Sequence, residues 1–461
     1  MPLDFVTTLR TKGRQRAGEI VNLLGISRPT LSRAVKGAGD LVVSRGKARR
    51  VAYAARRPLR GSMASLPLYR VDASGLPHEI ARLDLTYPDG CAADFLGDFG
   101  WPLDDEMRDG WFDGLPYPLQ DMRPQGFLGR GFARRHAALL QVSEDPTRWS
   151  DDDVLHALAL LGMDTPGDLI VGEAACHLWL EQVQLVRTGA GPDGLTESKI
   201  EEAYPRLAAI AMATGVAGSS AGGEFPKFTA LRQPAKGPAQ HVLVKFSGSD
   251  DSPGTQRWAD LLVCEHLAGR VLQEKLEIDA AASRIYRFEG RTFLEVDRFD
   301  RHGILGRSGL TSWMSLNAAF FGMAGRAWSE AARQLAEHEW LDRDDVARID
   351  RLWFFGQLIA NTDMHDGNLS FQPRPLKAGA GLRAAPAYDM LPMFYAPVRG
   401  VELPERRYEP RMALPAHMDA WRQACAAAIE FWALSASDKR ISAAFRGVCS
   451  ANAETLHGLL G

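Results

Sequence analysis

Residues 359–371 constrain this chain more than any other segment, because they set polar side chains at fixed spacing between apolar runs. Asp363 and Asn368 stand five residues apart, and Asp389 follows after a short gap. A site that transfers phosphoryl groups needs one carboxylate to orient the attacking hydroxyl, and an amide oxygen with a second carboxylate to hold Mg²⁺. The spacing therefore predicts a catalytic loop of that kind, seated on a packed scaffold.

The length and the cysteine pattern limit the class of protein. A chain of 461 residues is long enough for two or three domains with sizeable cores. Its five cysteines are scattered without a Cys-x-x-Cys pair, which argues against structural zinc and against a disulfide framework. The N-terminus lacks the apolar core of a signal peptide, and the apolar stretch 424–436 is too short to span a bilayer. We expect a soluble, cytoplasmic protein with no membrane partner.

The charge is divided unevenly along the chain. Residues 1–60 contain 14 Lys and Arg against 3 Asp and Glu, a net charge of +11. The other 401 residues contain 40 Lys and Arg against 54 Asp and Glu, a net charge of −14. A basic segment on an acidic body is expected of a nucleic-acid-binding module attached to a second unit, and a solvated basic tail is the alternative.

The pattern within this basic segment favours the first of these readings. Residues 17–25 have helical spacing and stop at a glycine, and Ser27 is a good N-cap for a second helix. Apolar runs at 41–43 and 51–53 flank a basic turn, which predicts a hairpin. Together these elements predict a winged helix-turn-helix, and DNA as a partner.

The second helix and the hairpin carry the side chains that would contact DNA. Any one of these cations is equally well explained as a solvated surface charge, but the clustering and the motif together favour DNA binding. The predicted DNA-binding residues are Arg28, Thr30, Ser32, Arg33, Lys36, Arg45 and Lys47.

The following segment, 62–210, is less informative. Residues 66–71 and 80–87 alternate like strands, and residues 151–161 have helical periodicity after Ser150, a plausible N-cap. The segment reads as an α+β domain without an assigned role.

Residues 215–231 are rich in Gly, Ser and Ala, and such small residues let backbone amides approach an anion. In isolation this loop is more often an ordinary flexible connection. A strand pattern follows at 241–246, with Lys245 inside an apolar run. Kinases use a lysine of this kind to hold ATP phosphates, whereas an edge-strand lysine that reaches solvent is the alternative.

Two further elements follow in the order that an ATP site requires. A helix expected at 257–268 carries Glu265, which is either a partner for Lys245 or a solvated helical carboxylate. A strand expected at 293–297 runs into a polar turn with Asp297 and Phe299, where an adenine-binding hinge would fall.

In this order the segments resemble the HipA family of bacterial toxin kinases over roughly residues 62–450. The motifs that carry the resemblance are the phosphate loop at 220–227, Lys245, the hinge strand at 296–301, the catalytic loop at 362–368 and the metal-binding Asp at 388–389. With its fused N-terminal winged helix, the chain is most similar to the YjjJ branch of that family.

The resemblance implies an α+β fold of two lobes, like that of protein kinases, with ATP and Mg²⁺ as cofactors. We expect the winged helix-turn-helix over residues 1–58, an N-terminal lobe with the phosphate loop and the ATP lysine over 62–300, and a helical C-terminal lobe over 301–461. In the usual family pair a separate chain is the DNA-binding antitoxin. Whether this chain also has an antitoxin partner stays open.

The resemblance also implies a role for each site residue. Asp363 would orient the substrate hydroxyl and accept its proton, and His365 would either support the loop or touch phosphate. Asn368 and Asp389 would hold Mg²⁺. The residues expected to bind ATP are Ser220, Ala221, Gly222, Gly223, Lys227, Lys245, Asp297 and Phe299.

The predicted function is Mg-ATP-dependent phosphorylation of Ser or Thr on a cellular protein, and relatives in the family act on aminoacyl-tRNA synthetases. Ser220, or alternatively Ser219, would be autophosphorylated, which would add negative charge where ATP phosphates bind. Two alternatives stay open. One is a DNA-binding transcriptional regulator whose kinase-like body is a sensor or a dimerisation unit, and the other is a small-molecule kinase.

Overall fold

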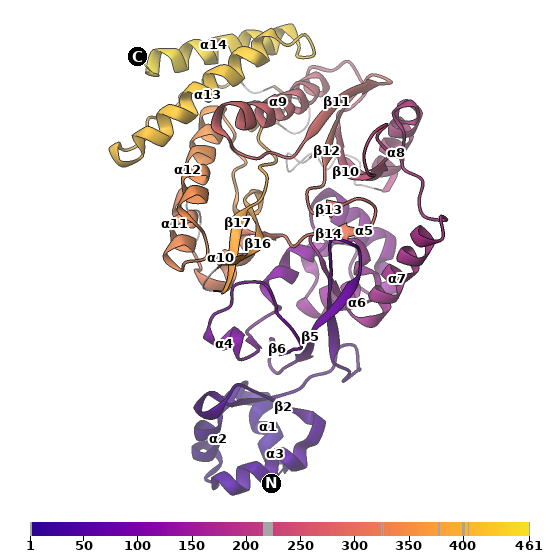
Figure 1. Ribbon diagram of the computed structural model, residues 1–461, viewed down its shortest axis with the longest axis vertical. Coiled ribbons are helices and arrows are strands. Elements are labelled where there is room, and N and C mark those ends of the chain that lie inside the picture. The colour runs from indigo at the N-terminus through magenta and orange to yellow at the C-terminus, as the bar shows by residue number, and fades with distance from the viewer. Residues whose placement is uncertain are drawn as a thin grey trace.

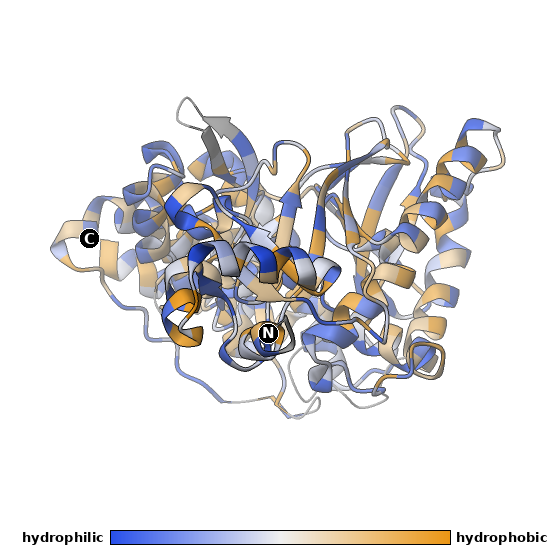
Figure 2. Ribbon diagram, turned by 90° about the horizontal axis from the view of Figure 1, so that it is seen from below, coloured by the Kyte–Doolittle hydropathy of each residue, from blue (hydrophilic) through white to orange (hydrophobic). Residues whose placement is uncertain are grey.

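The computed structural model describes residues 2–214, 225–323, 325, 327–376, 379–398, 402–403 and 405–460. The N-terminal unit lies at one end of the molecule, and the last two helices lie at the opposite end (Figure 1). A five-stranded sheet, a four-stranded sheet, two smaller sheets and a helical region lie between them. Along the helices and strands, hydrophilic and hydrophobic residues alternate as amphipathic elements require (Figure 2).

The N-terminal unit consists of three helices and a small antiparallel sheet of order β1-β3-β2. Its helices pack around Phe5, Leu9, Ile20 and Leu31. The two helices and the hairpin that the sequence predicted are present, and a first helix that was not predicted completes the core. The elements are α1 (Pro2–Lys12), β1 (Gln15–Arg16), α2 (Ala17–Leu24), α3 (Arg28–Ala38), β2 (Val42–Arg45) and β3 (Ala52–Ala55).

Local signals fix the turn between α2 and α3. Gly25 ends α2 with φ 61°, a left-handed conformation that glycine adopts without steric cost. Ser27 caps α3, because its Oγ accepts a hydrogen bond from the backbone N–H of Thr30.

A five-stranded sheet of order β7-β6-β5-β4-β8, called the middle sheet below, follows the N-terminal unit. Ser150 caps α6 as predicted, since its Oγ accepts from the N–H of Asp153 at 3.2 Å. The strands predicted at 66–71 and 80–87 are confirmed, and the second begins three residues earlier. The elements are β4 (Leu66–Val71), β5 (Pro77–Leu85), β6 (Cys91–Phe95), α4 (Asp105–Arg108), β7 (Trp111–Phe112), α5 (Gly126–Leu140), α6 (Asp151–Leu161), β8 (Leu169–Val171) and α7 (Glu173–Arg187).

A second, four-stranded antiparallel sheet has the order β11-β12-β10-β9. Helices cover both of its faces: Phe293 of β12 packs with Tyr204 of α8, and the adjacent Leu294 belongs to the core that contains α9. The elements are α8 (Ile200–Thr214), β9 (Lys227–Arg232), β10 (Gln240–Phe246), α9 (Pro253–Leu276), β11 (Ser283–Phe288) and β12 (Arg291–Asp297).

The C-terminal region is mainly helical, and the end of α12 leads into the predicted catalytic loop. Among the described helices, none combines the length and the apolar character needed to cross a bilayer. The elements are β13 (Arg301–His302), β14 (Gly306–Arg307), β15 (Thr311–Ser312), α10 (Trp313–Phe320), α11 (Trp328–Glu337), α12 (Arg343–Leu358), β16 (Ser370–Leu376), β17 (Gly379–Ala384), α13 (Met418–Ser437) and α14 (Ala443–Leu460).

Candidate functional site

Lys245 is buried in the four-stranded sheet and pairs with two carboxylates. Its strand, β10, lies between β12 and β9, and its side chain is 5% exposed. The ammonium Nζ lies 2.7 and 2.9 Å from the two oxygens of Glu265 on α9, and it also donates to Oδ1 of Asp389. The alternative of an edge-strand lysine reaching solvent is therefore wrong, and so is the reading of Glu265 as a solvated carboxylate.

Asp389 reaches this lysine because the segment before it is fastened to the end of α9. The backbone N–H of Ala387 donates to the carbonyl of Asp279, and the N–H of Ala281 donates to the carbonyl of Ala387. Asp389 itself has φ 54°, a left-handed conformation that is uncommon for a residue with a side chain. Its carboxylate is one-third exposed, so one side faces the buried lysine and the other is accessible.

The charge of Lys245 offsets the burial of Asp389 but not that of Glu265, whose pKa stays raised because burial, with the nearby Asp389 charge, outweighs the lysine. Burial lowers the pKa of the Lys245 ammonium. The negative charges of Asp389 and Glu265 raise it by more than burial lowers it, so the net shift is upward. Burial raises the pKa of Asp389, yet the positive charges of Lys245 and Lys227 outweigh it and the net shift is downward. Lys245 is therefore held as a cation and Asp389 as an anion at neutral pH.

The predicted catalytic loop is held by its own side chains. Asn361 Oδ1 accepts from the N–H of Asp363 at 3.0 Å, and Asn368 Nδ2 donates to the Asp363 carbonyl at 2.8 Å. These bonds leave the Asp363 carboxylate exposed at the surface. Because the side-chain nitrogen of Asn368 donates its hydrogen bond within the loop, the oxygen of the same amide is the atom suited to a cation.

His365 has a role inside the loop. Its Nδ1 accepts from the N–H of Gly367 at 3.0 Å, which is the supporting hydrogen bond expected in one of its two readings. After Lys245 and Lys227, His365 also contributes to the lowered pKa of Asp389. Contact with phosphate stays a prediction.

The nucleotide residues predicted from the sequence divide into two groups. Lys227 lies directly opposite Lys245 in the β9–β10 pair, and the ring of Phe299 lies 6.0 Å from that of Tyr388. Asp297 is paired with Arg284, 2.8 Å away. The second group, Ser220, Ala221, Gly222 and Gly223, lies outside the described residues, and so does Ser219, the alternative residue for autophosphorylation.

The sequence predicted no role for two side chains that join the predicted catalytic loop to the Asp389 segment. Besides its bond to Asp363, Asn361 donates from Nδ2 to the Asp389 carbonyl at 3.2 Å. The hydroxyl of Tyr388 donates to the Gly367 carbonyl at 2.8 Å and lies 2.7 Å from Ser370 Oγ. An amide two residues before Asp363 was the available signal, but the sequence does not identify its partners.

The turn after β12 is clamped to the middle sheet by buried ion pairs. Asp300 accepts from Arg298 and Arg301 at 3.2 and 2.7 Å, and from the N–H of Gly167 at 2.9 Å. Both Arg298 and Arg301 also reach Asp164, at 3.2 and 3.1 Å. The predicted hinge therefore rests on the loop before β8.

The predicted DNA-binding residues lie on two sides of the N-terminal unit. Arg28, Ser32, Arg33 and Lys36 are exposed on α3, and Lys47 is exposed in the hairpin. Thr30 is partly buried and bonds to Ser27 Oγ at 2.9 Å. Arg45 points the other way: its Nη2 is 3.2 Å from Asp84 and its Nε donates to the Ala93 carbonyl at 2.9 Å.

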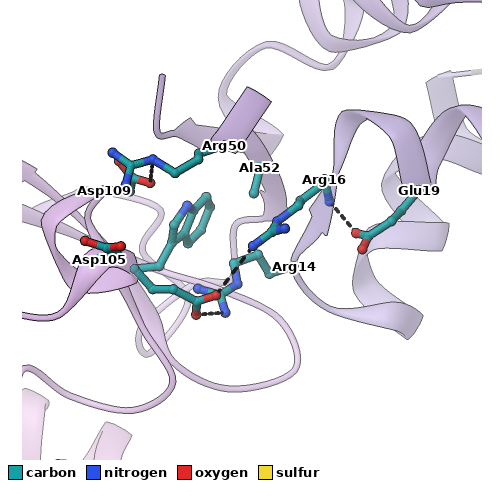
Figure 3. A pocket seen from close by; sticks show the side chains of 9 residues that line it. Arg14, Arg16, Glu19, Arg50, Ala52, Asp105 and Asp109 are labelled. Atoms are coloured by element: carbon teal, nitrogen blue, oxygen red, sulfur yellow. Dashed lines mark hydrogen bonds and ion pairs between the residues drawn. The ribbon is translucent and has the colours of Figure 1, made fainter. Parts of the chain in front are cut away.

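A polar pocket of about 460 Å³ opens between this unit and the middle sheet, far along the chain from Lys245 (Figure 3). Arg14 pairs across it with Glu106 at 2.5 Å, and Arg50 pairs with Asp109 at 3.0 Å. The cations of this pocket are paired with carboxylates from the other side. The pocket therefore belongs to the contact between the N-terminal unit and the middle sheet, which is called the seam below. Its lining residues are Arg14, Arg16, Glu19, Arg50, Ala52, Asp105, Glu106, Asp109 and Trp111.

Comparison with known proteins identifies two conserved-domain families in the part of the chain that follows the N-terminal unit. A family described as the YjjJ-like toxin middle domain matches residues 62–180, and the HipA-like C-terminal domain matches residues 219–455. The chain is 38% identical over 447 residues to Toxin YjjJ of Escherichia coli (strain K12), covering 97% of this chain and 96% of that protein.

One solved structure supports the fold. HipA of Shewanella oneidensis MR-1, from its complex with HipB and operator DNA, matches with a TM-score of 0.51 and 16% identity over 86% of this chain and 95% of that one. The Helicobacter pylori proinflammatory kinase CtkA matches 50% of this chain and 90% of its own at 10% identity, and its TM-score of 0.35 is too low to carry an argument. The mixed α/β fold is thus similar to that of HipA, and the chain belongs to the HipA-like toxin family, in its YjjJ-like branch.

Proposed function

We propose that this chain is a kinase that uses Mg²⁺ and ATP to phosphorylate Ser or Thr on a cellular protein. The observation that carries the proposal is the buried Lys245, held between Glu265 of α9 and the accessible Asp389. A lysine paired with a helical glutamate, beside a metal-binding Asp, is the arrangement that kinases need for activity.

The donor set fits Mg²⁺ and a nucleotide. Asn368 and Asp389 offer an amide oxygen and a carboxylate, which are the hard ligands that Mg²⁺ prefers. Within the described residues, no three His, Cys, Asp or Glu side chains gather as a metal site, so the protein would supply few ligands and leave the others to phosphate and water. Bound Mg-ATP supplies the phosphoryl group that is transferred.

The chain's own residues would do the remaining work. Lys245 would bind phosphate oxygens, and Lys227, opposite it in the sheet, would add a second cation. Asp363 would orient the substrate hydroxyl and accept its proton, which suits an exposed carboxylate on a loop held by Asn361 and Asn368. The backbone amides of residues 221–224 would cradle the phosphates, and phosphorylation of Ser220 would oppose ATP binding.

Transfer of labelled phosphate from ATP tests the proposal. Wild type should label itself or a protein in a cell extract, and Asp363→Asn and Asp389→Asn should each lose this labelling while staying folded. Phosphoproteomics of cells expressing wild type and Asp363→Asn would then identify the substrate. Labelling of small alcohols without any protein would favour a small-molecule kinase, and full activity in Asp363→Asn would disprove the catalytic assignment.

A second function, DNA binding by the N-terminal unit, is supported by the exposed cations on α3 and at Lys47. The HipA structure that this chain resembles was solved with HipB and operator DNA, which is consistent with DNA as a partner. Arg28→Glu with Arg33→Glu should abolish a gel shift that wild type gives at low salt, and an antitoxin partner would appear as a co-purifying protein. Arg16→Glu, at the seam, is the matched control.

A further inference from the structure

Asn361 lies between the two carboxylates proposed for catalysis, and it touches the backbone of both. Its side-chain oxygen accepts from the N–H of Asp363 at 3.0 Å, and its side-chain nitrogen donates to the carbonyl of Asp389 at 3.2 Å. The residue is 7% exposed, so these bonds are shielded from water. One buried amide therefore joins two segments that are 26 residues apart in the chain.

The backbone on both sides of this amide is in an uncommon conformation. Ala360 has φ 59° and Asp389 has φ 54°, and both are left-handed residues that carry a side chain. Such conformations persist only where the surroundings hold them. The Asn361 nitrogen holds the Asp389 carbonyl, and Tyr388 holds the other side of the segment through Gly367 and Ser370.

Only an amide suits this position. An aspartate has the same shape but has no N–H, so it would place a carboxylate oxygen against the Asp389 carbonyl. An alanine would leave both the Asp363 N–H and the Asp389 carbonyl without their partner. The two substitutions therefore separate the two halves of the amide: aspartate keeps the acceptor for Asp363, and alanine keeps neither.

We propose that Asn361 is a positioning residue that sets the backbone of Asp389 so that its carboxylate can hold Mg²⁺. The inference rests on the proposed function, because it concerns the metal that the kinase would use. Asn361 does not touch the reacting groups. It acts through Asp389, and it fixes Asp363 in the same register.

Mg²⁺ dependence tests this role with a readout that a purely structural residue would not move. The affinity of the full chain for ATP is measured by calorimetry over a range of Mg²⁺ concentrations, beside the rate of phosphoryl transfer. In Asn361→Asp, we expect the Mg²⁺ concentration for half-maximal ATP binding to rise about tenfold, as for the loss of one buried hydrogen bond. Saturating Mg²⁺ should restore most of the binding.

Asn452→Ala is the matched control. Asn452 is also a buried amide whose two halves are both used, but it lies in α14 and its partner is the hydroxyl of Tyr395 rather than the backbone of Asp363 or Asp389. Its substitution should lower the melting temperature and leave the Mg²⁺ dependence unchanged. Asn361→Ala should show both effects, and Asn361→Asp remains informative if the alanine variant fails to fold.

The outcomes separate this inference from the proposed function. If wild type transfers phosphate and both Asn361 variants keep its Mg²⁺ dependence, the positioning role is wrong and the kinase proposal stands. If wild type binds Mg-ATP but transfers nothing, the kinase proposal fails, and the Mg²⁺ requirement for binding still decides the role of Asn361. Wild type that does not bind Mg-ATP at all would overturn both.

Discussion

Two regions of this protein use cation–carboxylate pairs in different surroundings. At the site and its hinge, Lys245, Glu265, Asp300 and Arg301 are each less than 9% exposed. At the seam, where the N-terminal unit contacts the middle sheet, pairs are more exposed to solvent. The Arg50 side chain, for example, is about half exposed. The chemistry is the same, and the difference is access to water.

That difference decides what each pair does. A buried pair is costly to break, because removing one partner strands a charge in a low dielectric. A surface pair contributes about 0–1 kcal/mol and weakens with salt. We infer that the buried pairs fix the geometry of the site, and that the seam holds the N-terminal unit by many small contributions. The more exposed pairs are Arg14–Glu106, Arg50–Asp109 and Arg60–Asp153, whereas Arg45–Asp84 is drier, with side chains 21% and 10% exposed.

The largest effect is expected from Lys245→Met, which leaves Glu265 buried without its cation. The free energy of unfolding should fall by about 3–5 kcal/mol, as for other broken buried pairs. Phosphoryl transfer should be lost as well. Urea denaturation measures the stability, and labelled ATP measures the transfer.

A double variant sharpens this test. Lys245→Met with Glu265→Leu removes both charges, so most of the stability should return while activity stays lost. A single variant as stable as wild type would mean that the buried triad is not under the electrostatic constraint that its geometry implies.

The next effect concerns the hinge. Asp300→Asn keeps the shape of the side chain but removes a charge that faces both Arg298 and Arg301. We expect a loss of about 2–3 kcal/mol, less than for Lys245→Met because Asp164 still pairs with both arginines. Thermal unfolding of the two variants side by side gives the ranking, and an Asp300→Asn variant with wild-type stability would contradict it.

The sequence predicted the elements of the site better than their contacts. The apolar run around Lys245 and the helical pattern around Glu265 are local signals, so the strand and the helix could be predicted together with the order of the site residues. Arg45 shows what is missing. Its place in a basic hairpin favoured the prediction that it binds DNA. Its partner Asp84 is 39 residues away, however, and no local sequence pattern predicts a contact over that distance.

The same limit applies to Asn361 and to the N-terminal helix. Asn361 stands in the predicted loop, but its role depends on the Asp389 carbonyl, which only the folded chain brings near. The helix at Pro2–Lys12 has a weak periodic pattern, and Phe5 and Leu9 are buried only because α3 and β3 pack against it.

A smaller effect is expected from pH, at a histidine in the same buried region. Burial, with Arg440 and Arg270, lowers the pKa of His266 to about 4, and its Nδ1 lies 3.0 Å from Ser283 Oγ. The unfolded chain takes up the proton near pH 6.5. Stability is therefore complete above that pH and falls as the pH drops from about 6.5 towards 4.

At pH 5 the loss should be about 1 kcal/mol after discounting for the part of the ring that solvent reaches. His266→Gln cannot take up the proton, so its unfolding free energy should lose this part of the pH dependence. Equal slopes for variant and wild type between pH 7 and pH 5 would assign the acid sensitivity to other groups.

The smallest effect is expected at the seam. Asp109→Asn removes one carboxylate from the Arg50 pair, and its cost should stay below about 1 kcal/mol because the arginine remains solvated. The matched control is Asp105→Asn, since Asp105 lines the same pocket but pairs with Arg108 within α4. Salt at 1 M shortens the screening length to about 3 Å, so it should speed proteolysis between the two units in wild type. The proteolysis rate of wild type should then approach that of Asp109→Asn, while the main unfolding transition should not shift. If Asp109→Asn instead lowered the free energy of unfolding as much as Asp300→Asn, the seam pairs would behave like the buried pairs. The N-terminal unit would then be rigidly attached to the rest of the protein.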